Sequence, residues 1–276
     1  MTPLLEIPRA TGAGSASAPS PRGYHLASGS GPTVVVLASP IVRARSYRAT
    51  LTTLARSFRT VVLEMPGCGR GPRLSTPWTP QDYAQWLGPA LDALRIPRCV
   101  LVGHSNTGAT ALLAAALYPE RFAGLVLADS IGVATSPAHA MVRRRIVDSW
   151  FEVRATPIIL PDALFNLLVH RRNFAAQIRL AASFDVGAWA RRVTTPVLLA
   201  WGARDTTTPL AHLRRLSDLL PHAKIHVSHT GRHDWLIEYP EEFAEQVRRF
   251  VGCIRTVSDE TSPPTQTGAG AERTLG

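Results

Sequence analysis

Short apolar runs rich in β-branched residues alternate along this chain with stretches of helical pattern. The apolar runs fall at residues 33–37, 60–63, 99–102, 124–128, 196–201 and 224–227. Helix-like stretches fall at about 47–57, 79–94 and 241–251. The runs are apolar throughout, as in strands that are buried on both faces of a parallel sheet. The alternation therefore predicts an α/β fold, with a mostly parallel doubly wound sheet and helices on both faces.

One helix start is explicit in the sequence. Thr79 can act as the N-cap, Pro80 takes the first helical position and Asp82 stands at the third. An N-cap threonine with an acid three residues later forms a loose capping box, and proline suits the first turn. This pattern predicts a helix that runs to about Leu94.

Residues 132–190 break the alternation, because they contain helical patterns at 138–153 and 161–183 but no convincing strand. We predict an all-helical cap inserted between the two parts of an α/β core, 23–131 and 191–253. Open α/β sheets place their sites at the carboxyl ends of the strands. An insertion at this point is therefore expected to lie over the site.

The two ends of the chain are rich in small and polar residues. Residues 1–22 include ATGAGSASAPSPR, and residues 254–276 include SDETSPPTQTGAGAERTLG. Such segments bury too little apolar surface to offset the entropy of ordering. We predict that both are disordered.

No run of 18 or more apolar residues occurs in the 276-residue chain, so a membrane span is not expected. The N-terminal MTPLLEIPRATG has no charged leader followed by an apolar region. We therefore predict that the chain has no signal peptide and a cytoplasmic location.

The formal net charge is +10, from 30 Lys and Arg against 20 Asp and Glu. Lys224 is the only lysine, and the arginines are scattered among apolar residues without a nucleic-acid-binding motif. Nucleic acid is therefore not the expected partner. The charge is compatible with a solvated basic surface, or with an anionic substrate or an acidic carrier partner.

The three cysteines, Cys68, Cys99 and Cys253, are far apart and lack CxxC spacing. An odd number without paired spacing argues against a disulfide scaffold and against a zinc site. We predict no metal site.

Residues 103–108 read GHSNTG, between the apolar run at 99–102 and an Ala/Leu-rich helical stretch. Small residues around Ser105 would permit a strained turn that presents its hydroxyl at the positive end of the next helix. The Asn106 N–H would then face an oxyanion on a substrate. A helix N-cap is the alternative role for this serine.

An acid and a base that could activate such a serine follow further along the chain. Asp205 closes WGARD after one apolar run, and His233 stands in TGRHDW after the next, 100 and 28 residues further on (205 − 105 and 233 − 205). Asp129 at the end of the 124–128 run is an alternative acid, which we consider less suitable. His226, inside an apolar run, and His229, early in its loop, are less suitable bases.

These motifs resemble the α/β-hydrolase family over residues 23–253. GHSNTG resembles its nucleophile elbow, PGCGRGP one of its strand-end loops, and WGARD and the histidine before EYPEEF its acid and base loops. The resemblance implies Ser105 as nucleophile, His233 as base and Asp205 as the acid that orients it. It also implies an acyl-enzyme and hydrolysis of a small-molecule ester, lactone, thioester or related carbonyl compound, with no cofactor.

The sequence departs from the family where the second oxyanion donor belongs. Ala38 and Ser39 take the place of the usual His-Gly, which puts Pro40 on the donor position, and proline has no N–H. The Ile41 N–H or the Ser39 hydroxyl could replace the donor, or the reaction could need less oxyanion stabilisation. A third possibility is that the protein keeps Ser105, Asp205 and His233 for a non-hydrolytic or ligand-binding role.

The cap segment contains Trp150, Phe151, Phe165, Phe174 and Trp189. We expect most of these aromatic residues in the core and some in an apolar pocket. The same segment carries Arg143–Arg145, Arg171, Arg172 and Arg179. These charges suggest a carboxylate-bearing or carrier-bound substrate. The oligomeric state is not indicated by the sequence.

Overall fold

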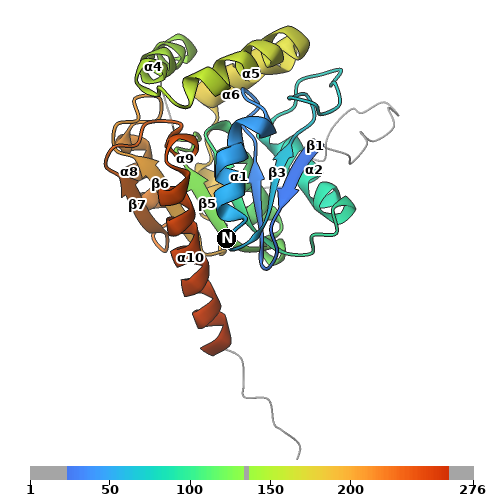
Figure 1. The fold of residues 1–276 in the computed structure, drawn as a ribbon, viewed down its shortest axis with the longest axis vertical. Helices are drawn as coiled ribbons and strands as arrows, with labels where there is room; N and C mark the ends of the chain where they lie inside the picture. Colours follow the sequence, from blue (N-terminus) through green and yellow to red (C-terminus); the bar gives the residue numbers. More distant parts are fainter. Residues whose placement is uncertain (1–23, 134–136, 261–276) are drawn as a thin grey trace, which may run out of the picture.

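The computed structural model describes residues 24–133 and 137–260 (Figure 1). A seven-stranded sheet has the order β1-β3-β2-β4-β5-β6-β7. Its strands are β1 (Tyr24–Ser28), β2 (Thr33–Leu37), β3 (Arg59–Glu64), β4 (Cys99–His104), β5 (Phe122–Ala128), β6 (Val197–Gly202) and β7 (Lys224–Ser228). All neighbouring pairs are parallel except β1 with β3. The predicted α/β fold with a mostly parallel sheet is confirmed. The segment 1–22, predicted to be disordered, lies outside the described residues.

Strand β1 was not predicted from the sequence. Its residues YHLAS are half-buried or exposed, so the strand lacks the apolar run that marks the others. It lies at the sheet edge and pairs antiparallel with β3, with Tyr24 opposite Glu64. The partner strand, rather than a local hydrophobic pattern, specifies this element.

Both faces of the sheet are covered by helices. They are α1 (Arg48–Leu54), α2 (Pro80–Ala93), α3 (Asn106–Leu117), α8 (Leu210–Leu219), α9 (Trp235–Glu238) and α10 (Pro240–Glu260), with short 3₁₀ turns η1 (Ala44–Tyr47) and η2 (Pro119–Arg121). Along β2, Val35 and Leu37 join the core beneath α2 and α3, whereas Val34 and Val36 join the core beneath α1 and α10. Alternate residues of a strand point to opposite faces, so a continuously apolar run fills two cores.

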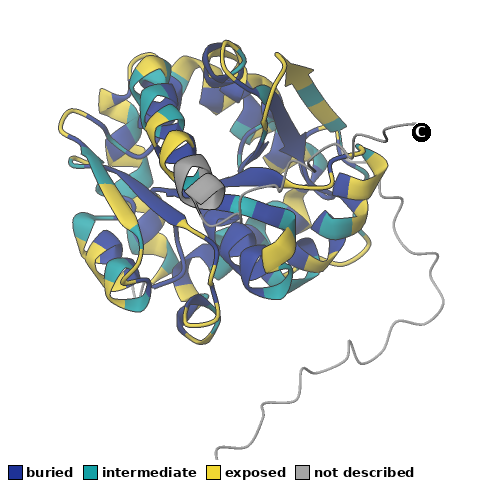
Figure 2. Cartoon of the chain, turned by 90° about the horizontal axis from the view of Figure 1, so that it is seen from below, coloured by how far each residue is buried: buried dark blue, intermediate teal, exposed yellow. Residues whose placement is uncertain are grey.

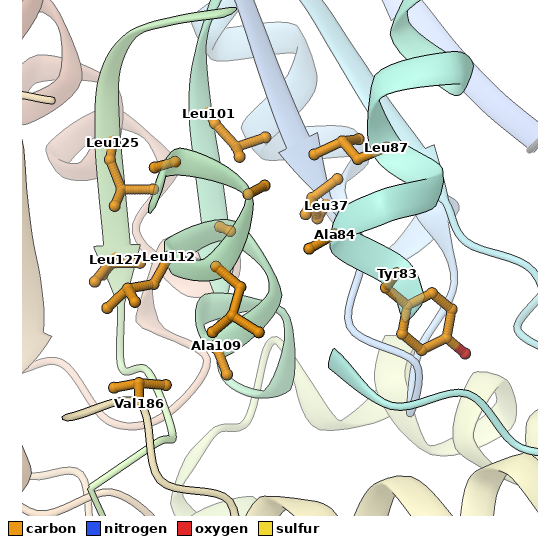
Figure 3. Packing of buried hydrophobic residues seen from close by; sticks show 14 of the residues in the cluster. Leu37, Tyr83, Ala84, Leu87, Leu101, Ala109, Leu112, Leu125, Leu127 and Val186 are labelled. Atoms are coloured by element: carbon orange, nitrogen blue, oxygen red, sulfur yellow. The ribbon is translucent and has the colours of Figure 1, made fainter. Parts of the chain in front are cut away.

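Figure 3 shows the first of these cores. Leu87 of α2 lies beside Leu37 of β2, and Leu112 of α3 lies beside Leu127 of β5. In Figure 2 the central strands are dark blue, and the exposed residues lie mainly on the outer helices and loops. The buried sheet is therefore a rigid support for the loops at its carboxyl edge.

The predicted start of α2 is confirmed in detail. The Thr79 side chain accepts from the Asp82 N–H, and the Asp82 carboxylate accepts from the Thr79 N–H at 2.7 Å. Pro80 lies in the first turn, and the helix ends at Ala93.

The insertion consists of helices throughout its described part: α4 (Ala138–Phe151), α5 (Thr156–Val169), α6 (Arg171–Ser183) and α7 (Gly187–Ala190). The predicted single helical stretch over 161–183 was wrong in two respects. Helix α5 begins at Thr156, because Pro157 suits its first turn, and Pro161 lies inside it. The chain then breaks at His170, whose Nε2 lies 3.0 Å from the Gly69 carbonyl oxygen.

The cap lies over the carboxyl ends of the strands. The Asn166 side chain donates to the Val42 carbonyl after β2, and the Asn173 side chain donates to the Gly67 carbonyl after β3, both at 2.9 Å. Asp148 accepts from the Thr207 N–H in the loop after β6, also at 2.9 Å. Figure 1 shows α4, α5 and α6 together at one end of the molecule.

The last helix differs from its prediction. Helix α10 continues to Glu260 instead of ending near Val251, so the tail predicted to be disordered from 254 begins inside a helix. The half-buried Ile254 still packs against the core, and no proline interrupts the chain before Pro263. Residues 261–276 lie outside the described residues.

In the described part of the chain, none of the helices is both long and apolar enough to cross a membrane.

Candidate active site

Ser105 occupies a sharp turn between β4 and α3. Its φ of +54° and ψ of −121° are rare for a residue with a side chain. The turn is held by the Ser105 N–H, which donates to the Ala128 carbonyl of β5 at 3.0 Å. The hydroxyl makes no capping hydrogen bond to α3, so the N-cap alternative does not describe this serine.

Two glycines permit this turn through the absence of a side chain. A Cβ on Gly103 would lie 2.6 Å from the Thr107 carbonyl oxygen and 2.7 Å from the Gly108 Cα. A Cβ on Gly108 would collide with Ser130. The backbone of β4, the turn and α3 therefore approach each other more closely than larger residues allow.

The structure brings the three residues of the sequence motif together. His233 Nε2 lies 2.9 Å from Ser105 Oγ, and His233 Nδ1 lies 2.9 Å from Asp205 Oδ2. All three side chains are buried, and His233 is only 3% exposed. With its Nδ1–H donated to Asp205, the imidazole has a free Nε2 lone pair directed at the serine hydroxyl.

The site's charges favour ionised Asp205 and support a basic His233. Burial alone would raise the pKa of Asp205, but the charge and hydrogen bonds of His233 and the hydrogen bond from Thr208 lower it well below its ordinary value. Burial likewise acts to lower the pKa of His233, yet the carboxylate of Asp205 outweighs it and raises the pKa above 6.5.

Asp129, the alternative acid, has other partners. It accepts from the Gly202 N–H at 2.9 Å and from the Trp235 indole N–H at 2.6 Å. Burial and the negative charge of Asp205 raise the pKa of Asp129 well above its ordinary value, which favours the protonated form. Asp129 therefore supports the loop that carries Asp205 and does not contact His233.

The other histidines considered as bases lie elsewhere. His226 Nε2 pairs with Glu242 at 3.0 Å, and His229 is exposed.

A buried polar network behind His233 was missed in the sequence. His104 Nε2 lies 2.9 Å from the His233 carbonyl oxygen, and its Nδ1 lies 2.8 Å from the Tyr47 hydroxyl. Burial lowers the pKa of His104 to about 4, which keeps the ring neutral near pH 7. Asp234 is buried and paired with Arg145 of α4. Its partner comes from the cap, 89 residues away, so local sequence carries no signal for this pair.

The residues on the oxyanion side lie beside the serine. Asn106 is the first residue of α3, and its side chain donates to the Gln177 carbonyl of the cap at 3.1 Å. The Val42 N–H donates to the Ser39 carbonyl at 3.0 Å, which closes a turn with Pro40 at its second position. Proline is favoured there. Of the residues described, none accepts a hydrogen bond from the Ile41 or Asn106 N–H.

A cavity of about 770 Å³ adjoins the serine. Its walls include Ser105, His233, Ser39, Ile41 and Asn106. The remaining walls are mainly apolar and come largely from the cap, including Met141, Ile159, Phe174, Ile178 and Ala181. The volume and lining suit a medium-sized apolar ligand.

Residues 44–155, which include the elbow, match the family model described as alpha/beta hydrolase fold. The chain has the α/β-hydrolase fold. Over 247 residues it is 28% identical to the "Putative carbamate hydrolase RutD" of Pseudomonas syringae pv. syringae, and the match covers 80% of this chain and 93% of that relative. This similarity supports hydrolase activity.

Solved structures with the same fold include a thermophilic esterase from Thermogutta terrifontis, with a TM-score of 0.70 and 20% identity, covering 84% of this chain and 93% of the esterase. The enol-lactonase from Burkholderia xenovorans has a TM-score of 0.72 and 17% identity, covering 83% of this chain and 96% of the lactonase. At these identities the similarity concerns the fold.

Proposed function

We propose that this α/β-hydrolase-fold protein is a serine hydrolase that cleaves an apolar acyl compound through an acyl-enzyme. The observation that carries the proposal is the hydrogen-bonded series Asp205–His233–Ser105 at 2.9 Å per step, in the wall of an apolar cavity. A serine hydroxyl needs such a base, and the base needs a carboxylate to fix its tautomer and stabilise its charged form.

In the first half-reaction, Ser105 Oγ attacks the carbonyl carbon of the substrate while His233 Nε2 takes the hydroxyl proton. The tetrahedral intermediate collapses, and His233 returns that proton to the leaving group. In the second half-reaction, His233 deprotonates a water that attacks the acyl-serine carbonyl. Collapse of this second intermediate releases the acid and restores the Ser105 hydroxyl.

The oxyanion of each intermediate is stabilised by two backbone donors in this proposal. The Asn106 N–H lies at the N-terminus of α3, where the helix dipole favours negative charge. The Ile41 N–H is the second donor, because the turn closed by Val42 and Ser39 leaves it unused and Ile41 lines the cavity. This assignment moves the donor one residue past Pro40.

The substrates to test first follow from the cavity and the relatives. An apolar cavity of about 770 Å³ favours a medium-sized acyl group. Esters, lactones and carbamates present the same carbonyl to the serine, and relatives or fold neighbours are named as an esterase, an enol-lactonase and a carbamate hydrolase. The proposed location is the cytoplasm.

A fluorophosphonate probe tests the proposal, because it reacts with activated serines. We expect rapid labelling of the wild-type protein, loss of labelling in Ser105→Ala, and slow labelling in His233→Ala. A matched variant, Ser228→Ala, replaces a buried serine that contacts Glu242 and should label normally. A folded wild-type protein that resists the probe would instead favour the ligand-binding role.

A further inference from the structure

The outer surface of the cap is apolar to an unusual degree. Among the described residues, twelve large apolar side chains are exposed, and all except Ile225 lie between Val142 and Leu168, on α4, α5 and their connection. Trp150 is 79% exposed and Leu168 is 71% exposed. Such a large exposed patch marks a surface that binds something. We call these eleven side chains the cap face: Val142, Ile146, Val147, Trp150, Phe151, Val153, Ile158, Leu160, Leu164, Leu167 and Leu168.

The orientation of these helices is fixed by buried polar side chains on their inner sides. Asp148 pairs with Arg232 at 3.3 Å, and Glu152, directly after α4, accepts from the Asp234 N–H at 2.7 Å. On α5, Asp162 accepts from Ser46 at 2.7 Å, and Asn166 donates to the Val42 carbonyl. Rotating either helix to bury its apolar side would expose or break these contacts. These buried polar contacts therefore keep the cap face directed outward.

The exposed charges on the cap are almost all positive. Exposed arginines occur on α4, after α4, and at the start and end of α6: Arg143, Arg154, Arg171, Arg172 and Arg179. Of the acidic residues in 137–190, Asp148, Glu152 and Asp162 are fully buried, and only Asp185 is exposed. The cap thus combines an apolar face with flanking positive charge.

This combination distinguishes among possible partners. A second copy joined through the same face would bring like-charged arginines together, which disfavours the contact. An acidic carrier protein would pair with the arginines but leave the apolar side chains uncovered. An anionic lipid surface satisfies both, because its headgroups attract arginine and its acyl region accepts apolar side chains.

The cavity that contains Ser105 also reaches this face. Trp150, Val153 and Leu160 are exposed members of the cap face and are also walls of the cavity. A molecule that leaves a lipid layer between α4 and α5 would reach Ser105 through apolar walls.

We propose that the cap face docks this protein on an anionic lipid surface, and that the cavity draws an apolar acyl substrate from that surface. The docking is independent of the proposed catalysis, whereas the supply of substrate rests on it. Docking of this kind is peripheral and needs no membrane-spanning helix.

Binding is measured first with full-length Ser105→Ala protein, so that no turnover occurs. The probes are vesicles of phosphatidylcholine alone, and vesicles in which one third of the lipid is phosphatidylglycerol and the rest is phosphatidylcholine. We expect binding to the anionic vesicles at least about tenfold tighter, because each arginine near such a surface contributes on the order of 1 kcal/mol. High salt should weaken it. Trp150 fluorescence should shift to the blue as its indole leaves water, and Trp150→Phe should remove that shift.

Variants separate the cap face from the rest of the surface. Leu164→Ser with Leu168→Ser, which do not line the cavity, should weaken vesicle binding about tenfold or more. Ile225→Ser, at the exposed apolar residue outside the cap, should leave it unchanged. Arg171→Gln with Arg172→Gln should weaken binding to anionic vesicles, whereas the matched exposed pair Arg214→Gln with Arg215→Gln on α8 should not.

Three results would overturn the docking proposal: no binding to anionic vesicles, equal weakening by the cap and control variants, or a dimer in solution that protects Trp150 and does not bind lipid. Hydrolysis of a water-soluble short-chain ester tests catalysis separately. The Leu164/Leu168 double variant should still hydrolyse the water-soluble ester, but it should lose activity on esters carried in vesicles. Vesicle binding without any hydrolysis would refute the proposed function and leave the docking intact.

Discussion

At the scale of single residues, one buried carboxylate controls the charge of the candidate site. Asp205 accepts from His233 and from the Thr208 N–H, the latter at 2.8 Å, and both bonds favour its ionised form. Its negative charge in turn makes His233 more basic than burial alone would allow. The pair therefore sets the pH range in which Ser105 can be deprotonated.

The first prediction concerns Asp205→Asn. His233 must be neutral to accept a proton, so wild-type kcat/KM should fall as pH drops, with a midpoint above 6.5 because the His233 pKa is raised. Removing the carboxylate should move this midpoint to lower pH and reduce kcat/KM by about 10³–10⁴. A pH–rate profile of both proteins measures the effect. Glu242→Gln, which alters the distant His226–Glu242 pair, should leave the profile unchanged.

The buried His104 provides a second prediction, about stability. Its pKa is about 4 in the folded protein against 6.5 when unfolded, because burial disfavours the charged ring. Between pH 6.5 and 4 the unfolded chain binds the extra proton, so this residue makes stability fall as pH falls. The full difference corresponds to roughly 3 kcal/mol at most.

Replacing His104 with Gln should flatten this slope. Denaturant titrations at pH 7.0 and 4.5 give the free energy of unfolding of wild type and variant at each pH. The change in this free energy between the two pH values, compared between wild type and variant, measures the contribution of His104. Glu152, whose pKa is raised to about 7 by burial and by Asp234, contributes with the opposite sign in both proteins and cancels. A variant with an unchanged pH slope would show that His104 is not held neutral.

At the scale of elements, the strand–turn–helix unit that carries Ser105 depends on close backbone packing. Adding a Cβ at Gly103 would place it 2.6 Å from a carbonyl oxygen, and backbone cannot move aside as a side chain can. At Gly252, in α10, a Cβ would meet nothing within 4 Å. The two glycines thus offer the same substitution in opposite environments.

We predict that Gly103→Ala destabilises the protein by about 2 kcal/mol or more, through overpacking at the turn. Gly252→Ala should be neutral or stabilising by about 0.5–1 kcal/mol, because alanine has the higher helix propensity. Thermal unfolding monitored by circular dichroism compares them. Equal melting temperatures for the two variants would contradict the packing argument.

The same elements show why sequence predicted some features and missed others. Local patterns predicted the central strands, the capping box at Thr79 and the order of Ser105, Asp205 and His233, because each is specified by a few adjacent residues. Strand β1, the Tyr47–His104–His233 contacts and the Asp234–Arg145 pair depend on residues distant in sequence. Most of the aromatic residues in the cap were expected in the core, but Trp150 and Phe151 are exposed, because polar contacts such as Asp148–Arg232 hold the other side of α4 inward.

At the scale of the whole molecule, the protein has two unlike ends. The cap, with its apolar face and exposed arginines, lies at one end above the carboxyl edge of the sheet, and α10 extends toward the other (Figure 1). Between them the sheet is buried on both faces and carries the site at its edge. Any contact made by the cap face is therefore adjacent to the cavity and far from the end of α10.

Helix α10 also has a practical use. Cys253 on its C-terminal half is exposed, whereas burial raises the thiol pKa of both Cys68 and Cys99 to about 12 and makes them unreactive. A maleimide reagent should consequently couple at one position, leaving the opposite pole unmodified. Biotin attached there would orient the protein on a streptavidin sensor with its cavity mouth toward the flowing solution.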